Sequence, residues 1–170
     1  KLKGKSLYLE LMNLNNSNKN KIYSLKKVKK VLKHIVSTLM EIQKKYPSFR
    51  HNDLHWENVF VSSDGKKIAI GDFGFSNIQL VGYKNPIVQN GLFEDQYGIG
   101  KKTNKKYDIA FLLNDIHLRG NYEIKRFIET LIPLNYIGET STKLIQSRMR
   151  YNVNHSKFPS LKKIFDKLYK

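Results

Sequence analysis

The chain has 170 residues, of which 40% are hydrophobic, so it is long enough to bury the core of one domain. It contains no Cys, which excludes disulfide bonds and thiolate chemistry, and no run of about 18 apolar residues that could span a membrane. Its 31 basic and 14 acidic residues give a net charge of +17.

The first part of the chain predicts a short strand, a polar loop and a long helix. Residues 6–12 (SLYLELM) are typical of a short buried strand, and residues 13–20 (NLNNSNKN) of a polar loop. From Ser24 to Tyr46, apolar residues recur at three- and four-residue steps, which predicts an amphipathic helix with Lys and Gln on its outer face. Pro47 ends this helix.

The middle of the chain predicts a β-hairpin between two polar segments. Residues 51–58 read HNDLHWEN and are followed by VFV, the turn SSDG, and KIAI at 67–70. Two short apolar runs joined by a four-residue turn ending in Gly indicate a hairpin. Asp72 follows the second strand directly. We therefore expect the hairpin to bring Asp53, Asn58 and Asp72 together at its base.

The rest of the chain predicts a long loop and three helices. Residues 75–106 are irregular and rich in Gly and Pro, which is typical of a functional loop. Helices are predicted over 107–118 and 122–132, and a last one over 159–170 with Pro159 at its start. The fold class is therefore α+β, mainly helical with a small β-hairpin, and no second domain is apparent.

The three side chains at the base of the hairpin suit phosphoryl transfer. Asp and Asn oxygens are hard ligands of the kind that Mg²⁺ prefers in proteins. One acid can hold the metal while another accepts a proton from an attacking hydroxyl. Catalysis of phosphoryl transfer consists mostly of positioning and charge neutralisation, so these groups are the minimal equipment for it.

The two polar segments resemble the motifs of protein kinases. HNDLHWEN resembles the catalytic loop H-R-D-L-x-x-x-N, with Asp53 as the base and Asn58 five residues later. DFG at 72–74 matches the metal-binding triplet that follows that loop. SLYLELM resembles the hinge strand between the two kinase lobes. YDIAFLL resembles the helix whose leading Asp, here Asp108, accepts hydrogen bonds from the backbone of the catalytic loop.

The LHW sequence at 54–56 and the VFV and YDI segments resemble the haspin-type kinases in particular, which carry HRDLHWGN. His55 stands where most Ser/Thr kinases have a Lys, and a His there also occurs in relatives of the aminoglycoside and choline kinases. The resemblance implies that His55 contacts the γ-phosphate or the surroundings of the substrate hydroxyl.

The chain departs from the kinase pattern in three places. Asn52 replaces the Arg that pairs with a phosphorylated activation loop, so we do not expect switching by loop phosphorylation. No A-P-E follows DFG, so the substrate platform is expected to be remodelled. No Gly-rich loop and no V-A-I-K lysine precede the hinge. We therefore expect a kinase C-terminal lobe without its N-terminal lobe, which by itself binds ATP poorly.

By this resemblance the domain layout is a hinge at 1–13 and a C-terminal lobe at 14–170, with the activation segment at 75–106. The implied reaction is transfer of the γ-phosphate of ATP to Ser or Thr hydroxyls of proteins, with ATP and Mg²⁺ as cofactors. The implied site residues are the catalytic Asp53 and His55, the magnesium ligands Asn58 and Asp72, and the nucleotide-binding Glu10 and Met12, whose backbone groups face adenine.

Other polar residues are predicted to be structural. His51 is expected to be a buried imidazole that is hydrogen-bonded to backbone, and Trp56 is expected to pack in the core. Asp64 and Asp115 have no motif context, and we expect them at the surface or in caps.

The net charge of +17 leaves the partner open. A lysine-rich solvated surface explains it as well as an acidic partner does, and such a partner is nucleic acid, an anionic membrane surface or an acidic protein. No nucleic-acid-binding motif accompanies the charge. Because a basic lobe repels basic peptides, an acidic or phosphorylated protein substrate is favoured.

The Lys-, Asn- and Ile-rich composition favours an AT-rich genome, such as that of a large DNA virus or a parasite. We expect an intracellular protein of the cytoplasm or nucleus, or of the host cell or virion if it is viral.

Two other functions remain open on the sequence. The first is a small-molecule kinase of the aminoglycoside or choline type, which the pattern D-L-H-x-x-N also fits; the hinge and the Phe of DFG weigh against it. The second is a non-catalytic pseudokinase or basic scaffold. The intact Asp53, Asn58 and Asp72 weigh against this second function.

Overall fold

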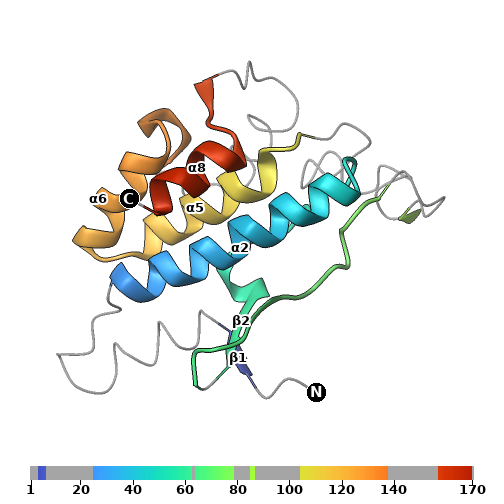
Figure 1. Ribbon diagram of the computed structural model, residues 1–170, viewed down its shortest axis with the longest axis horizontal. Coiled ribbons are helices and arrows are strands. Elements are labelled where there is room, and N and C mark those ends of the chain that lie inside the picture. The colour runs from blue at the N-terminus through green and yellow to red at the C-terminus, as the bar shows by residue number, and fades with distance from the viewer. Residues whose placement is uncertain are drawn as a thin grey trace.

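The computed structural model describes residues 25–62, 64–78, 85–86, 104–137 and 157–169, and the backbone of residues 4–6. Figure 1 shows helix α2 lying across the molecule, with α5, α6 and α8 on one side of it and a small sheet on the other. The described elements, in chain order, are β1 (Gly4–Ser6), α2 (Leu25–Lys45), η1 (Trp56–Asn58), β2 (Val59–Ser62), β3 (Ile68–Ile70), α5 (Tyr107–Arg119), α6 (Tyr122–Leu131), η3 (Leu134–Tyr136) and α8 (Leu161–Leu168).

Helix α2 confirms the helix predicted over 24–46. Its apolar residues at three- and four-residue steps form one buried face, which consists of Val28, Val31, Leu32, Ile35, Val36 and Leu39. Lys44 and Lys45 lie in its last turn, where positive charge complements the helix dipole. The helix ends at Lys45, two residues before Pro47, so the predicted stop is also confirmed.

Helix α5 lies at the centre of the core and is buried on nearly all sides from Tyr107 to Asn114. A helix that is buried all round consists mostly of apolar residues, as α5 does. Asp108 and Asn114 are the polar exceptions along that stretch. A buried carboxylate requires hydrogen-bond donors, so Asp108 indicates that α5 has a role besides packing in the core.

Helices α6 and α8 cover the core on the side away from the sheet (Figure 1). Asn121 caps α6 by accepting a hydrogen bond from Ile124 N at 3.0 Å. Ser160 caps α8 in the same way, so this helix begins at Leu161 and not at Pro159 as predicted, because the cap residue precedes the first helical turn.

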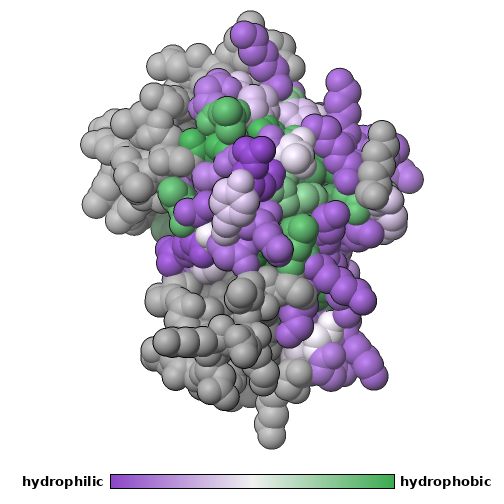
Figure 2. Space-filling model, turned by 90° about the vertical axis from the view of Figure 1, so that its left-hand side faces the viewer, coloured by the Kyte–Doolittle hydropathy of each residue, from purple (hydrophilic) through white to green (hydrophobic). Residues whose placement is uncertain are grey.

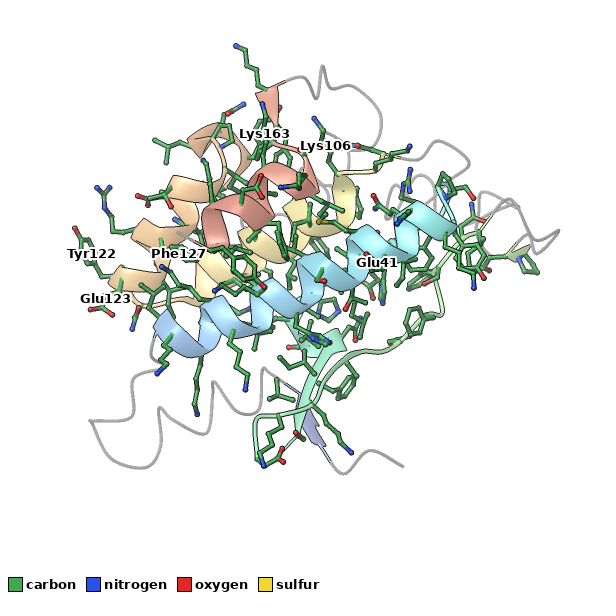
Figure 3. The ribbon with its side chains drawn as sticks, viewed as in Figure 1. Glu41, Lys106, Tyr122, Glu123, Phe127 and Lys163 are labelled. Carbon is green, nitrogen blue, oxygen red and sulfur yellow. The ribbon has the colours of Figure 1, made fainter. Side chains whose placement is uncertain are left out.

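Lysines of α2 rest on aromatic rings of these neighbouring helices. The Lys29 ammonium lies 4.7 Å from the ring centroid of Phe127 on α6, which Figure 3 labels. The Lys33 ammonium lies 4.1 Å from that of Tyr169, just after α8. These contacts let the lysine-rich face of α2 lie against other helices without burying its charge.

The sheet has three antiparallel strands in the order β1-β2-β3. The predicted hairpin is confirmed: β2 pairs with β3, with Val59 opposite Ile70, and Gly65 adopts a φ of 66° in the turn between them. Strand β1 covers Gly4–Ser6, of which the sequence predicted only Ser6 as part of a strand. The predicted strand over 6–12 otherwise stays a prediction, because residues 7–12 lie outside the described residues.

The described surface at one end of the molecule is mostly hydrophilic (Figure 2). Figure 2 shows the end of the molecule at the left of Figure 1, where hydrophilic side chains cover most of the described part and leave small hydrophobic patches between them. Tyr122, at the start of α6, is one of the exposed hydrophobic residues there, with 77% of its surface accessible (Figure 3). Among the described residues, no helix combines the length and the hydrophobicity needed to cross a bilayer.

Candidate active site

The loop of residues 51–58, here the 51–58 loop, is fixed at its start by a buried carboxylate. Asp108, in the first turn of α5, is 1% exposed. Its Oδ2 accepts the backbone N–H of His51 and its Oδ1 accepts that of Asn52, both at 2.9 Å. The predicted role of Asp108 is thereby confirmed. Hydrogen bonds to a buried carboxylate are strong, so the start of the loop is held in one conformation.

A second carboxylate of α5 fixes the far end of the same loop. Asp115 accepts the backbone N–H of Trp56 at its Oδ2, at 3.2 Å, and pairs through Oδ1 with Arg119 Nε at 3.0 Å. The Arg119 guanidinium lies 5.8 Å from the centroid of the Trp56 ring system. The prediction that Asp115 is a surface or capping residue was therefore wrong. Its position seven residues after Asp108, on the same helix face, was the signal that could have identified it.

Asn58 brings the catalytic residues suggested by the sequence into contact. Its Nδ2 donates to Asp53 O at 2.9 Å, lies 3.4 Å from Asp53 Oδ2, and lies 3.2 Å from His55 Nε2. Asn58 is only 7% exposed, so this amide is fixed by its surroundings. Its Oδ1 accepts no hydrogen bond from the described part of the chain, which leaves one hard oxygen for an external partner.

His55 and Asp53 are electrostatically coupled. His55 Nε2 lies 3.6 Å from Asp53 Oδ2, and both side chains are about one-quarter exposed. The neighbouring Asp53 carboxylate is the largest cause that raises the pKa of His55, and it outweighs the opposing effect of burial. Nε2 accepts from Asn58 when it carries no proton and donates to Asp53 when it does. The protonation state of His55 therefore selects between its two partners.

Gly71 joins the base of the hairpin to this loop. Its N–H donates to Asn58 O at 2.9 Å, and its carbonyl oxygen lies 3.0 Å from His51 Nε2. Asp72, the next residue, is exposed and adopts a left-handed φ of 56°. The structure thus brings Asp53, His55 and Asn58 into direct contact, and it connects Asp72 to them through the backbone of its neighbour.

His51 is buried and neutral, in agreement with the prediction that it is a structural imidazole. Burial is the largest cause that lowers its pKa, and it outweighs the opposing effect of Asp108. A carbonyl oxygen only accepts, so Nε2 carries the proton and donates to Gly71 O. The imidazole also lies against Phe73, with the ring centroids 5.0 Å apart. Phe73 is 50% exposed.

The segment after DFG is fastened to the start of the 51–58 loop by neutral groups. The hydrogen bonds are Arg50 N to Asn77 O (3.0 Å), Asn77 N to Arg50 O (2.9 Å) and Asn52 Nδ2 to Phe75 O (2.8 Å). Farther along the segment, Asn85 Nδ2 donates to Gly74 O at 2.8 Å. The Asn52 backbone has a left-handed φ of 69°, which Asn tolerates better than most residues. These bonds involve no charged side chain, and the expectation about loop phosphorylation stays a prediction.

The donor set suits a divalent cation that keeps part of its water shell. Asn58 Oδ1 and the exposed carboxylate of Asp72 are hard oxygens, and Mg²⁺ typically binds through one or two such groups together with phosphates and waters. The described residues contain no group of three His, Cys, Asp or Glu that forms a metal site by itself. Glu10 and Met12, which the sequence suggests for adenine binding, lie outside the described residues.

Comparison with known families gives one assignment. Residues 3–169 match a family model described as "Haspin like kinase domain". This range includes the 51–58 loop, the DFG triplet and all the described helices. A comparison with curated proteins finds no match.

Proposed function

Because the chain belongs to the haspin-like kinase family, we propose that it transfers the γ-phosphate of ATP to Ser or Thr hydroxyls of proteins. The observation that carries this proposal is the direct contact among Asp53, His55 and Asn58 on a loop that Asp108 and Asp115 hold at both ends. Phosphoryl transfer depends mainly on positioning, and this loop positions its side chains through the fold itself.

Asp53 is the proposed base. Its carboxylate is 29% exposed, so a substrate hydroxyl can reach it, while Asn58 contacts it from the protein side. A carboxylate held in this way orients the hydroxyl for attack and takes up its proton as the new bond forms.

His55 is proposed to supply positive charge next to the transferred phosphate. Asp53 stabilises the protonated imidazole and raises its pKa, so the cationic form persists to higher pH than in an ordinary His. In this role the imidazolium replaces the Lys that most Ser/Thr kinases have here. The protonated Nε2 donates a hydrogen bond to Asp53 or, when ATP is bound, to a phosphate oxygen.

Asn58 Oδ1 and Asp72 are the proposed magnesium ligands. Bound Mg²⁺ offsets the negative charge of the phosphates that would otherwise repel the attacking oxygen. The hydrogen bond from Gly71 N to Asn58 O ties the residue before Asp72 to Asn58, which supports this pairing of ligands. Kinases of this family use ATP and a divalent metal in general.

The proposed domain layout assigns residues 1–13 to the hinge, with Glu10 and Met12 presenting backbone groups to adenine, and residues 14–170 to the C-terminal lobe. The helix-rich architecture with its small sheet is compatible with this assignment. The 75–106 segment is the proposed activation segment. Hydrogen bonds from its first residues, up to Asn77, to Arg50 and Asn52 support a segment that is fixed at its start.

The proposed protein substrate is acidic or phosphorylated. The whole chain carries a net charge of +17, and helix α2 alone contains seven Lys and one Glu. Such a surface attracts acidic partners and repels basic ones. A preference for Arg or Lys around the phosphorylated residue in a peptide array would contradict this part of the proposal.

The test is a phosphoryl-transfer assay with the full-length protein, labelled ATP and Mg²⁺. Its acceptors are an acidic Ser/Thr protein, a Tyr peptide, an aminoglycoside and choline. We expect label on Ser and Thr only, and a loss of about 10²–10⁴-fold in Asp53→Asn. Asp64→Asn, in the exposed turn between β2 and β3, is the matched control and should keep full activity. Label on a small molecule, or full activity in Asp53→Asn, would overturn the proposal.

A further inference from the structure

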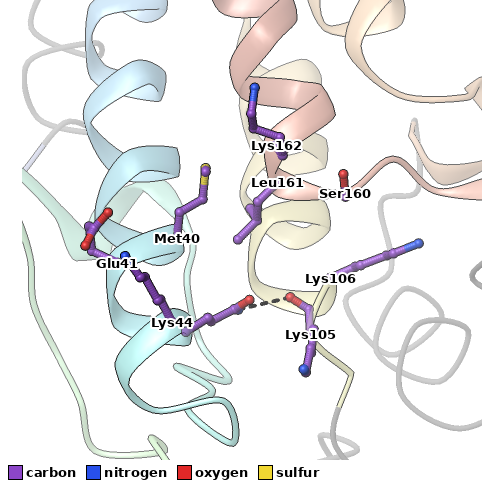
Figure 4. A pocket seen from close by; sticks show the side chains of 9 residues that line it. Met40, Glu41, Lys44, Lys105, Lys106, Ser160, Leu161 and Lys162 are labelled. Carbon is purple, nitrogen blue, oxygen red and sulfur yellow. Dashed lines mark hydrogen bonds between the residues drawn. The ribbon is translucent and has the colours of Figure 1, made fainter.

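A pocket with a rim of lysines, here the lysine pocket, lies away from the 51–58 loop. It is a cavity of about 570 Å³ between the second half of α2, residues 105–106 before α5, and the start of α8. Cavities of this size hold a drug-sized molecule or a few residues of a peptide. Figure 4 shows Met40 of α2 and Leu161 of α8 on facing sides of the gap between these helices, so the interior offers an apolar contact.

The charge around the lysine pocket is strongly positive. Its lining includes Lys44, Lys105, Lys106 and Lys162 and one acid, Glu41. The Lys44 and Lys105 ammonium groups have no hydrogen-bond or ion-pair partner in the described part of the chain. Lys162 pairs with Asp166, but both side chains are at least half exposed, so the pair is weak. A net positive charge therefore remains at the rim.

The lysines come from three separate elements and surround the cavity. In Figure 4 their ammonium groups point away from one another, as like charges do. The Gln43 side chain donates to Lys105 O at 3.1 Å, and the Lys106 ammonium donates to Phe158 O, so the backbone around the cavity is fixed. Long lysine stems can turn towards an anion in the cavity without moving this backbone.

The chemistry of the lining favours a peptide over a nucleic acid. No aromatic ring is among the described lining residues, so a base has no surface on which to stack. The cations are lysines, which act as point charges and lack the planar fork of Arg. An extended peptide with several acidic side chains and one apolar residue satisfies both the charged rim and the Met40–Leu161 contact.

We infer that the lysine pocket is a docking site for an acidic peptide segment of a protein partner. The inference rests on the proposed function in one respect, since the partner that gains most from docking is a kinase substrate. The pocket shares no residue with the 51–58 loop or with DFG. Docking there raises the local concentration of a substrate and leaves the chemistry of phosphoryl transfer unchanged.

The test measures binding without catalysis. The probe is a fluorescent peptide of alternating Glu and Leu, and its anisotropy is followed with the full-length protein in the absence of ATP. We expect Lys44→Glu/Lys105→Glu to weaken binding about tenfold or more at low salt, and the milder Lys44→Ala/Lys105→Ala to weaken it less. Lys66→Glu/Lys67→Glu, an exposed pair with the same charge change, should leave the dissociation constant within about twofold.

Two outcomes would contradict the docking site. Equal weakening in the two Glu pairs would show a general charge effect without a pocket. Equal competition by an oligonucleotide of the same charge would replace the peptide by nucleic acid. Phosphorylation of a short neutral peptide should be unchanged in Lys44→Glu/Lys105→Glu. If the proposed function fails, no protein is phosphorylated at all, whereas the binding contrast between the two pairs persists.

Discussion

The 51–58 loop and the lysine pocket use polar groups in opposite ways. In the loop, backbone N–H groups are buried against the carboxylates of Asp108 and Asp115, and the side chains of Asp53 and Asn58 are in contact. In the pocket, the Lys44 and Lys105 charges stand at the surface without a partner among the described residues. The comparison shows that the fold itself sets the geometry of the loop, whereas the pocket supplies charge and no fixed geometry. Substitutions in the loop should therefore change stability and rate, and those in the pocket should change salt-dependent binding.

The largest effect is expected at Asp108. Asp108→Ala leaves the buried N–H groups of His51 and Asn52 without an acceptor, at a cost of about 1–3 kcal/mol each. This is a large part of the stability of a typical domain, so the variant should unfold at a much lower urea concentration. Asp166→Ala, which changes an exposed side chain of α8, is the control and should unfold like the wild type. If the wild type, Asp108→Ala and Asp166→Ala unfold at the same urea concentration, the fold does not depend on the hydrogen bonds to Asp108.

The next effect concerns the charge of His55. We expect kcat/KM to fall as the pH rises through the raised pKa of His55, because the cation is lost there. The stabilising pair with Asp53 is present at low pH and is lost over the same range, since the folded-state pKa is the higher one. His55→Gln should lower activity about 10²-fold and flatten this limb of the pH profile.

His55→Lys is the matched variant for that experiment. Its amine stays protonated to about pH 10, so activity should be kept and the loss at high pH should move upwards. A profile that is the same in wild type, His55→Gln and His55→Lys would exclude the imidazolium from the reaction.

A smaller effect is expected at Asp115, which acts through the loop as a positioning residue. Asp115→Ala removes the acceptor of Trp56 N–H and the partner of Arg119, and kcat should fall about tenfold with little change in the KM for ATP. Asp115→Asn keeps an oxygen for Trp56 N–H and should lie between Ala and wild type. If kcat is as low in Asp115→Asn as in Asp115→Ala, the reaction requires the negative charge of Asp115 and not only its hydrogen-bond acceptor. If neither differs from the exposed Glu123→Ala control, Asp115 is not a positioning residue.

The smallest effect concerns Asn52, whose amide fastens the segment after DFG. Asn52→Gly keeps the left-handed backbone and removes the hydrogen bond to Phe75 O, which contributes about 1 kcal/mol. Amide exchange around Phe75 should become severalfold faster, and Asn52→Ala should add the cost of a left-handed backbone. If amide exchange is unchanged in both variants, the segment is held by the backbone hydrogen bonds between Arg50 and Asn77 and not by the Asn52 side chain.

The elements that follow periodicity were predictable from the sequence, and those that depend on distant contacts were not. The apolar steps of α2 and the Gly-ended turn before β3 are local signals, and both elements lie where they were predicted. The pairing of β1 with β2 joins residues far apart in the chain, and the sequence around Gly4 carries no sign of it. The extent of α8 was misjudged by two residues because Pro159 precedes the cap and does not begin the helix.

The residues of the candidate site also fall into two groups, those that a local sequence pattern identifies and those that depend on distant contacts. Asp53, Asn58 and Asp72 could be selected because two motifs carry them at fixed spacing, and Asp108 because it leads a recognisable helix. Asp115 was missed because its partner is a backbone N–H 59 residues away, and its only local signal is its position seven residues after Asp108 on the same helix face. The lysine pocket escaped notice for a similar reason, since three separate elements each contribute only a part of its lining.

Magnesium-dependent binding of ATP to the full-length protein tests the central claim most directly. The claim is that Asn58 and Asp72, from two separate loops, hold one magnesium–nucleotide complex. Titration of ATP with and without Mg²⁺ should show tight binding only with the metal, and Asp72→Ala should abolish that difference while Asp64→Ala keeps it. Binding of ATP that ignores Mg²⁺, or a metal dependence that survives in both Asp72→Ala and Asn58→Ala, would contradict the account.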